Sequence, residues 1–103
     1  MIELQRKVAE FVKEHQLEAG VEARFLDLIS EIGELSKEHL KATDYGKKDG
    51  YVTESLMNEY GDVMFSLICL ANSMGIDMEH ALECALSKYK YRLEQTGKAG
   101  SGL

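Results

Sequence analysis

The two segments that decide the fold read LISEIGEL over residues 28–35 and NEYGDVMF over residues 58–65. In each segment two carboxylates stand three positions apart among apolar residues at helical spacing. These carboxylates are Glu31 and Glu34 in the first segment and Glu59 and Asp62 in the second. Side chains three positions apart in a helix lie about one turn apart on one face. The repeated pattern therefore predicts two helices that each carry a pair of carboxylates.

The helical phase places both pairs beside the residues that are expected to form the core. The expected core stripes are Leu28, Ile32 and Leu35 on the first helix, and Leu56, Tyr60, Val63, Leu67 and Leu70 on the second. Glu31 and Glu59 stand at the edges of these stripes. Carboxylates in such places lose part of their water and repel one another unless a cation or another partner compensates. A solvated helix face is the alternative, although like charges three apart slightly destabilise a helix.

The kind of ligand atom indicates the kind of metal. Carboxylate oxygens suit Mg²⁺, Mn²⁺ or Ca²⁺ better than zinc or copper, which favour imidazole and thiolate. Mg²⁺ also takes phosphate oxygens from a substrate, which points to phosphate chemistry. A di-iron bundle would need Glu-x-x-His on two helices. None of His15, His39 and His80 has a glutamate three positions before it, so this alternative fails.

Length and composition indicate one small helical domain. The 103 residues include no proline and no tryptophan, and helix-favouring residues are plentiful. We expect a single all-α domain over residues 1–96 and a disordered tail over residues 97–103. The formal charge of −6 argues against a nucleic-acid polymer as partner, because Lys and Arg drive that binding.

Four helices are expected along the chain, in a four-helix bundle-like fold. Their ranges are about 2–15, 22–42, 54–74 and 78–95, with Thr53 and Asp77 as N-caps and Gly75 as the stop of the third helix. The third helix has apolar residues on more than one side, more than a lone bundle of short helices can hide. We therefore expect homo-oligomerisation to complete the fold.

Cysteine usage and hydropathy bear on the compartment. Cys69 and Cys84 lie in apolar helical surroundings, and we expect both to be reduced core thiols. No apolar run approaches the roughly 20 residues of a membrane span, and the N-terminus lacks a signal-peptide pattern. We expect a cytoplasmic protein without a membrane partner.

Gly33 and Gly61 are costly inside helices, and close backbone packing is the expected reason.

The paired segments resemble the motif of the MazG-like nucleotide pyrophosphohydrolases, in which ExxE is followed after a spacer by ExxD. Here 24 residues separate Glu34 from Glu59. The segment 70–77, with the Ala- and Leu-rich stretch after it, also resembles this family, so the likeness covers about residues 20–95. Many members carry another acidic residue directly before the first motif glutamate, where this chain has Ser30.

The resemblance implies an all-α homodimer or homotetramer that hydrolyses a nucleoside triphosphate to the monophosphate and pyrophosphate with Mg²⁺. Its implied metal ligands are Glu31, Glu34, Glu59 and Asp62. Basic residues on the last helix of family members face the phosphates, and Lys88 and Arg92 are the nearest candidates here, with Lys90 competing with Lys88. One carboxylate can also act as base toward the attacking water, and we favour Glu34 over Glu38 for this role.

A protein of another class remains as the alternative. A non-catalytic acidic helical dimer could bind nucleotides or a protein partner through an exposed apolar face. This alternative explains the methionines as adaptable packing residues. It leaves the two carboxylate pairs unexplained.

Overall fold

The computed structural model describes residues 2–97 and shows four α-helices. They are α1 (Ile2–Glu14), α2 (Val21–Ala42), α3 (Glu54–Ser73) and α4 (Met78–Thr96). The all-α class is confirmed, and each expected helix end lies within one residue of the observed end. The expected tail, apart from Gly97, lies outside the described residues. Over residues 2–97, no helix has the length and apolar character that crossing a membrane requires.

The helix ends follow the local signals in the sequence. The Thr53 side chain accepts a hydrogen bond from the backbone N–H of Leu56 at 3.0 Å, and so caps α3. Asp77 caps α4 by accepting from the backbone N–H groups of Glu79 and His80. Gly75 has a φ of +67°, a left-handed conformation that glycine adopts without steric cost, and α3 ends just before it. The two expected N-caps, Thr53 and Asp77, and the expected helix stop at Gly75 are confirmed.

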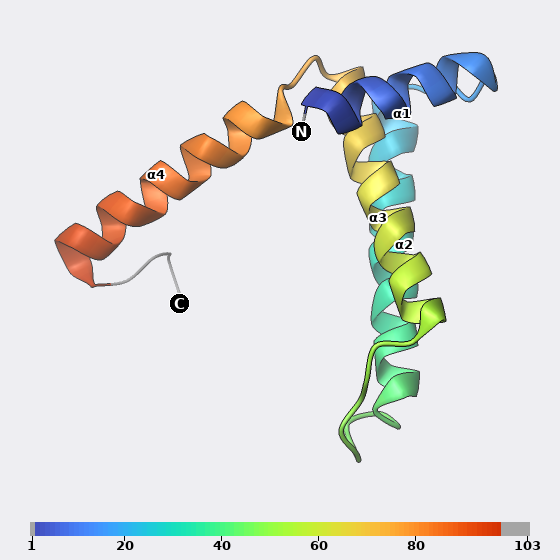
Figure 1. Cartoon of the computed structure of the whole chain (residues 1–103), viewed down its shortest axis with the longest axis vertical. Coiled ribbons are helices and arrows are strands. Elements are labelled where there is room, and N and C mark those ends of the chain that lie inside the picture. Colours follow the sequence, from blue (N-terminus) through green and yellow to red (C-terminus); the bar gives the residue numbers. More distant parts are fainter. Residues whose placement is uncertain (1, 98–103) are drawn as a thin grey trace.

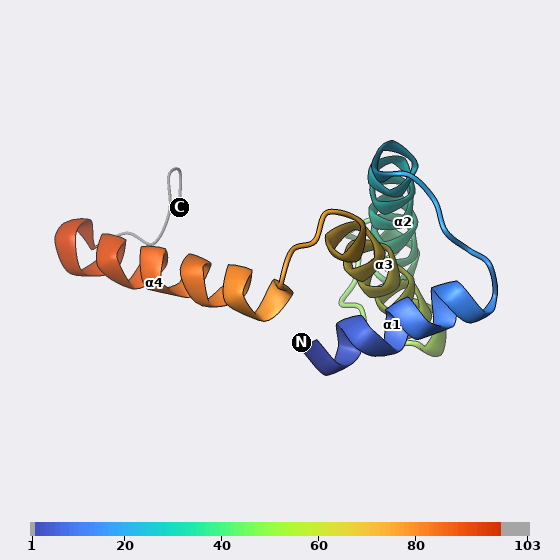
Figure 2. The ribbon, with the colours of Figure 1, turned by 90° about the horizontal axis from the view of Figure 1, so that it is seen from above.

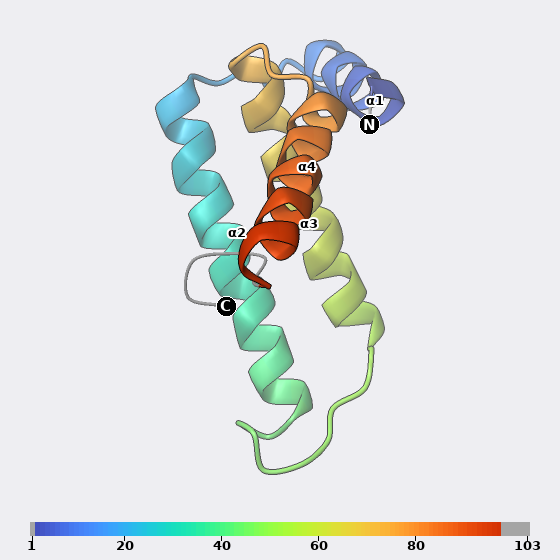
Figure 3. The same ribbon diagram turned by 90° about the vertical axis from the view of Figure 1, so that its left-hand side faces the viewer.

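The helices form a packed group of three with one projecting arm (Figure 1). α2 and α3 run side by side in opposite directions, and the connection between them lies at the end remote from α1 (Figure 3). α1 lies across the other end of this pair, as the view from above shows (Figure 2). α4 leaves the end of α3 and extends away from the α2–α3 pair (Figure 1).

The core is centred on α3, because this helix contacts both α1 and α2. The buried apolar residues of the described chain all belong to it: Leu56, Ile68, Cys69, Leu70 and Ala71. α1 is attached to α3 by an edge-to-face contact between Phe11 and Phe65, with ring centroids 6.1 Å apart. Gln5 and Asn72 add a reciprocal pair of hydrogen bonds at the same junction.

The expected core stripes are only partly right. Ile32, Tyr60 and Leu67 are 47%, 62% and 42% exposed. Glu31 and Glu59, which were expected at the stripe edges, are themselves half-buried between the helices. The physical reason is that α4 projects away from the α2–α3 pair, so within residues 2–97 it leaves apolar faces of both α2 and α3 open (Figure 1).

Two other expectations are wrong. A Cβ atom built at Gly33 or Gly61 would meet no atom of residues 2–97 within 4 Å, so no close backbone packing in this part of the chain explains these glycines. Cys69 is a buried free thiol as expected, but Cys84 is exposed. Its sulfur lies 3.6 Å from Nε2 of His80 on the surface of α4. Cys84 is exposed because α4 projects away from the α2–α3 pair (Figure 1).

Candidate metal centre

Three of the expected carboxylates meet between α2 and α3. Glu31 on α2 and the pair Glu59 and Asp62 on α3 each offer a carboxylate oxygen, and these oxygens lie within 4.8 Å of one another. The cluster forms because Glu59 and Asp62 are one turn apart on α3 and the neighbouring helix presents Glu31 to them. Tertiary packing thus adds the cross-helix partner that neither segment supplies alone.

Glu59 is the electrostatic focus of this cluster. Its Oε2 atom is buried and has no hydrogen-bond partner among the described residues. Burial raises the pKa of the Glu59 carboxyl, and the negative charges of its neighbours raise it further, in the order Asp62, Glu31, Glu34 and Glu38. An unpartnered carboxylate oxygen among like charges is the arrangement that a bound cation would relieve. All three donors are oxygens, so the set fits a hard divalent cation such as Mg²⁺.

Glu34 and Glu38 lie near the cluster but outside its three-residue set. Glu34 is exposed on α2, and its charge still acts on Glu59. Glu38 is half-buried and pairs with Lys41, whose Nζ lies 3.4 Å from Oε1. The expected role of Glu34 as a fourth ligand or as the base stays a prediction.

The basic residues of α4 that were expected to bind the phosphates do not lie beside the carboxylate cluster within one chain. Nζ of Lys88 sits 5.0 Å from the ring centroid of Tyr89 on the same helix, and Arg92 is half-buried. Because α4 extends away from the α2–α3 pair, a single chain does not bring these cations to its own carboxylates (Figure 1). Their role in substrate binding stays a prediction.

Two cations near the α2–α3 interface were missed by the sequence reasoning. Lys41 is the partner of Glu38, and its spacing of three residues on one helix was a readable signal. Arg24 is buried, with only 7% of its surface exposed. Its position four residues before Leu28 and seven before Glu31 follows the inner phase of α2, so its burial could have been inferred from the stripe.

Fold and site together define the class: an all-α protein whose central helix pair holds a carboxylate cluster suited to a hard cation. Residues 20–96 match the model of the MazG nucleotide pyrophosphohydrolase domain, and the chain belongs to this family. It is also 36% identical over 93 residues to a Bacillus subtilis (strain 168) protein named "Uncharacterized protein YpjD", a match that covers 87% of this chain and 79% of that protein. No solved structure matched the chain.

Proposed function

We propose that the chain is a Mg²⁺-dependent nucleoside triphosphate pyrophosphohydrolase, which converts an NTP or dNTP to the monophosphate and pyrophosphate in the cytoplasm. Membership of the MazG family supports the reaction class. The observation that carries the proposal is the unpartnered Oε2 of Glu59 inside a cluster of three carboxylates. A site that concentrates negative charge can accept a triphosphate only when a cation accompanies it.

The proposed metal ligands are Glu31, Glu59 and Asp62, with Glu34 as the fourth. A bound Mg²⁺, or Mn²⁺ in its place, would neutralise charge on the triphosphate and make the α-phosphorus more electrophilic. The half-burial of Glu31 and Glu59 holds their side chains in one region of the helix interface. Preorganised ligands lose little conformational freedom when they bind.

The proton of the attacking water needs an acceptor. Glu34 is exposed beside the cluster, whereas Glu38 is held by Lys41. We therefore propose that a carboxylate oxygen of Glu34 accepts the proton as water attacks the α-phosphorus. The bond from this phosphorus to the bridging oxygen of the β-phosphate breaks, and pyrophosphate leaves with the electron pair.

The exposed surface supports a homodimer or homotetramer. A folded monomer of 11.6 kDa exposes roughly 5,800 Å² on the usual scaling with mass, whereas this chain exposes 7799 Å². The difference between these two areas is similar in size to the surface that a stable protein–protein interface buries. The apolar side chains left open on α4 recur every three or four positions: Leu82, Leu86, Tyr89 and Leu93. A second copy that covers this stripe could receive Lys88 and Arg92 beside its own carboxylates.

The test is pyrophosphate release from ordinary and modified ribo- and deoxyribonucleotides, with and without Mg²⁺. We expect Glu59→Gln to abolish turnover while the helical circular dichroism stays intact. Glu54→Gln is the matched control, since Glu54 is an exposed glutamate on the same helix, outside the cluster. Turnover by Glu59→Gln at the parental rate would refute the assignment.

The non-catalytic alternative gives a different result in the same assay. A nucleotide-binding module would show a rise in melting temperature with Mg²⁺ and a nucleotide, but no pyrophosphate. A protein-interaction module would show neither. Exposed methionines such as Met57 and Met64 fit such a module as adaptable contact residues.

A further inference from the structure

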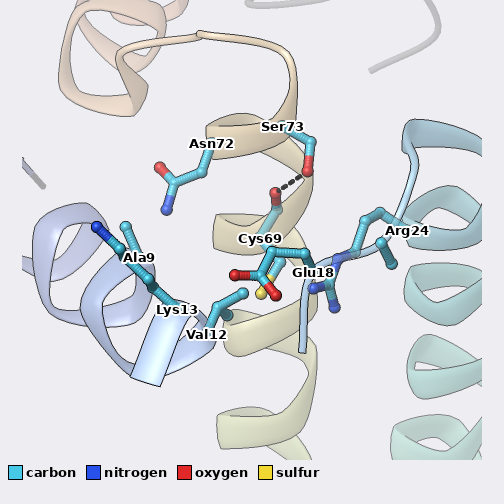
Figure 4. Close-up of a pocket in the computed structure, with 9 residues that line it drawn as sticks. Ala9, Val12, Lys13, Glu18, Arg24, Cys69, Asn72 and Ser73 are labelled. Atoms are coloured by element: carbon cyan, nitrogen blue, oxygen red, sulfur yellow. Dashed lines mark hydrogen bonds between the residues drawn. The ribbon is translucent and has the colours of Figure 1, made fainter. Parts of the chain in front are cut away.

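A pocket of about 320 Å³ opens where α1, the α1–α2 loop and α3 meet, and it contains none of the carboxylates of the metal centre. Figure 4 shows the side chains of Arg24, Glu18 and Cys69 converging in it. Small apolar side chains, including Ala9 and Val12, form much of its wall. Arg24 precedes Glu31 by seven residues on α2, or about 10 Å along the helix. The pocket is therefore a separate place in the fold.

Arg24 is an unusual lining residue for this pocket, because it is a charged side chain that is buried. It is only 7% exposed, and buried arginines are normally paired with an anion. Its guanidinium donates a hydrogen bond from a terminal nitrogen to the carbonyl oxygen of Leu17. Its Nε is buried without any hydrogen-bond partner, and no ion pair joins Arg24 to a carboxylate within residues 2–97. A buried guanidinium edge thus lacks an acceptor.

The start of α2 also favours an anion near Arg24, beyond the one negative charge that Glu22 supplies in this first turn. Arg24 lies in the first turn of α2, at the positive end of the helix dipole, where a cation is unfavourable. The N-cap residue Gly20 provides no side-chain acceptor for the first N–H groups of this helix. Burial raises the pKa of the Cys69 thiol, so its sulfur is a neutral wall rather than a counter-charge.

We propose that this pocket binds a small organic oxyanion, whose phosphate or carboxylate group accepts hydrogen bonds from Nε and a terminal nitrogen of Arg24. Planar oxyanions match the guanidinium edge in this two-bond geometry. The volume exceeds what an inorganic anion fills, and it lies at the lower end of the range for small-molecule sites, about 300–1,000 Å³. An organic body therefore covers Ala9, Val12 and Cys69 while the anionic head meets Arg24.

Glu18 is the internal competitor for Arg24. Its carboxylate shares the pocket, yet it forms no ion pair with Arg24 in the structure. A negative charge in the same space opposes a bound anion. Glu18→Gln removes this charge from an exposed loop position and should therefore tighten binding several-fold.

The experiment titrates the full-length protein, after EDTA treatment and desalting that removes the chelator, with four probes: phenyl phosphate, benzoate, inorganic phosphate and phenol. EDTA removes divalent metal, so the result does not depend on the proposed hydrolase activity. NMR of the arginine Nε–H groups reads the site directly, because Arg6, Arg24 and Arg92 are the arginines of this chain. Calorimetry measures each Kd.

We expect phenyl phosphate or benzoate to shift the Arg24 resonance at millimolar concentration, and comparison of the two distinguishes phosphate from carboxylate as the head group. Inorganic phosphate should bind more weakly because it leaves the apolar wall uncovered, and phenol should leave Arg24 unshifted. Arg24→Gln should weaken binding about ten- to hundredfold, the range of a lost charged hydrogen bond. Arg6→Gln is the control, since Arg6 is exposed and already paired with Glu3 and Glu10.

Arg24 is buried, so Arg24→Gln can unfold the chain; the probe titration and Glu18→Gln then decide the question. Two results would overturn the proposal. In one, no organic anion shifts the Arg24 resonance in either the parental protein or Glu18→Gln. In the other, Glu18→Gln alone shifts this resonance and lowers the melting temperature, which would identify Glu18 as the counter-ion.

Discussion

The substitution Glu59→Gln should separate metal binding from fold stability. The change keeps the shape of the side chain and removes the charge of the residue whose Oε2 lacks a partner. In the parental protein, Mg²⁺ should raise the melting temperature, because a ligand that binds only the folded state stabilises it. In the variant this rise should be absent or much reduced.

The size of the rise follows from mass action. At a Mg²⁺ concentration ten times Kd, binding to the folded state adds about 1.4 kcal/mol. For a domain of this length, each kcal/mol moves the melting temperature by about 4–8 °C. The parental protein should therefore melt roughly 6–11 °C higher with Mg²⁺ than in EDTA.

Without metal, the Glu59→Gln variant should have a higher melting temperature than the parental protein. Burial and neighbouring carboxylates raise the folded-state pKa of Glu59, so its ionisation destabilises the fold. As the pH rises through the ordinary range of a glutamate, the unfolded chain releases this proton first, and stability falls until the folded-state pKa is passed. Glu59→Gln should then melt higher than the parental protein in EDTA at neutral pH, and the difference should vanish in acid.

Differential scanning fluorimetry at fixed protein concentration measures both effects, with Glu54→Gln as the control whose Mg²⁺-induced shift should equal that of the parental protein. An equal Mg²⁺ shift in the parental protein and in Glu59→Gln would refute the proposed metal centre. A lower melting temperature of Glu59→Gln in EDTA at neutral pH would show instead that Glu59 has a stabilising partner.

Three further predictions concern the arm, the assembly and the core. Arg92→Ala should lower kcat/KM about ten- to hundredfold through loss of a charge-assisted hydrogen bond to the leaving pyrophosphate, and Lys90→Ala should cost less; steady-state kinetics that reverse this order would place Lys90 in the site. Sedimentation at micromolar concentration should show a species larger than the 11.6 kDa chain, and Leu86→Glu should shift it toward monomer; a monomeric parental protein would contradict this. Ile68→Ala should lower the free energy of unfolding by about 2–5 kcal/mol, because Ile68 is 2% exposed; chemical denaturation that finds a loss under 1 kcal/mol would argue against this packing.

The local features of this fold could be predicted well because they depend on neighbours in sequence. Thr53, Gly75 and Asp77 end or begin helices through backbone conformation and short-range hydrogen bonds. Each such interaction spans only a few residues. The helix bounds were therefore readable without knowledge of the packing.

The burial pattern was less predictable because it depends on which helices pack together. Tyr60 and Leu67 follow an apolar spacing that a complete bundle would bury, but among residues 2–97 they remain 62% and 42% exposed. Cys84 is exposed for the same reason, since it belongs to the projecting α4. Periodicity predicts which residues share a face, and it does not predict whether a neighbour covers that face.

The sequence by itself determined the all-α class, the helix ends and the carboxylate pairs, because helical spacing and capping act within a few residues. Only the tertiary structure decided that Glu31 meets Glu59 and Asp62, and that Glu34 stands outside this set. It alone placed Arg24 in a pocket without a counter-ion and carried α4 away from the carboxylates. The reason is physical: distances between helices and the burial of charge arise from packing across the chain, which no local pattern encodes.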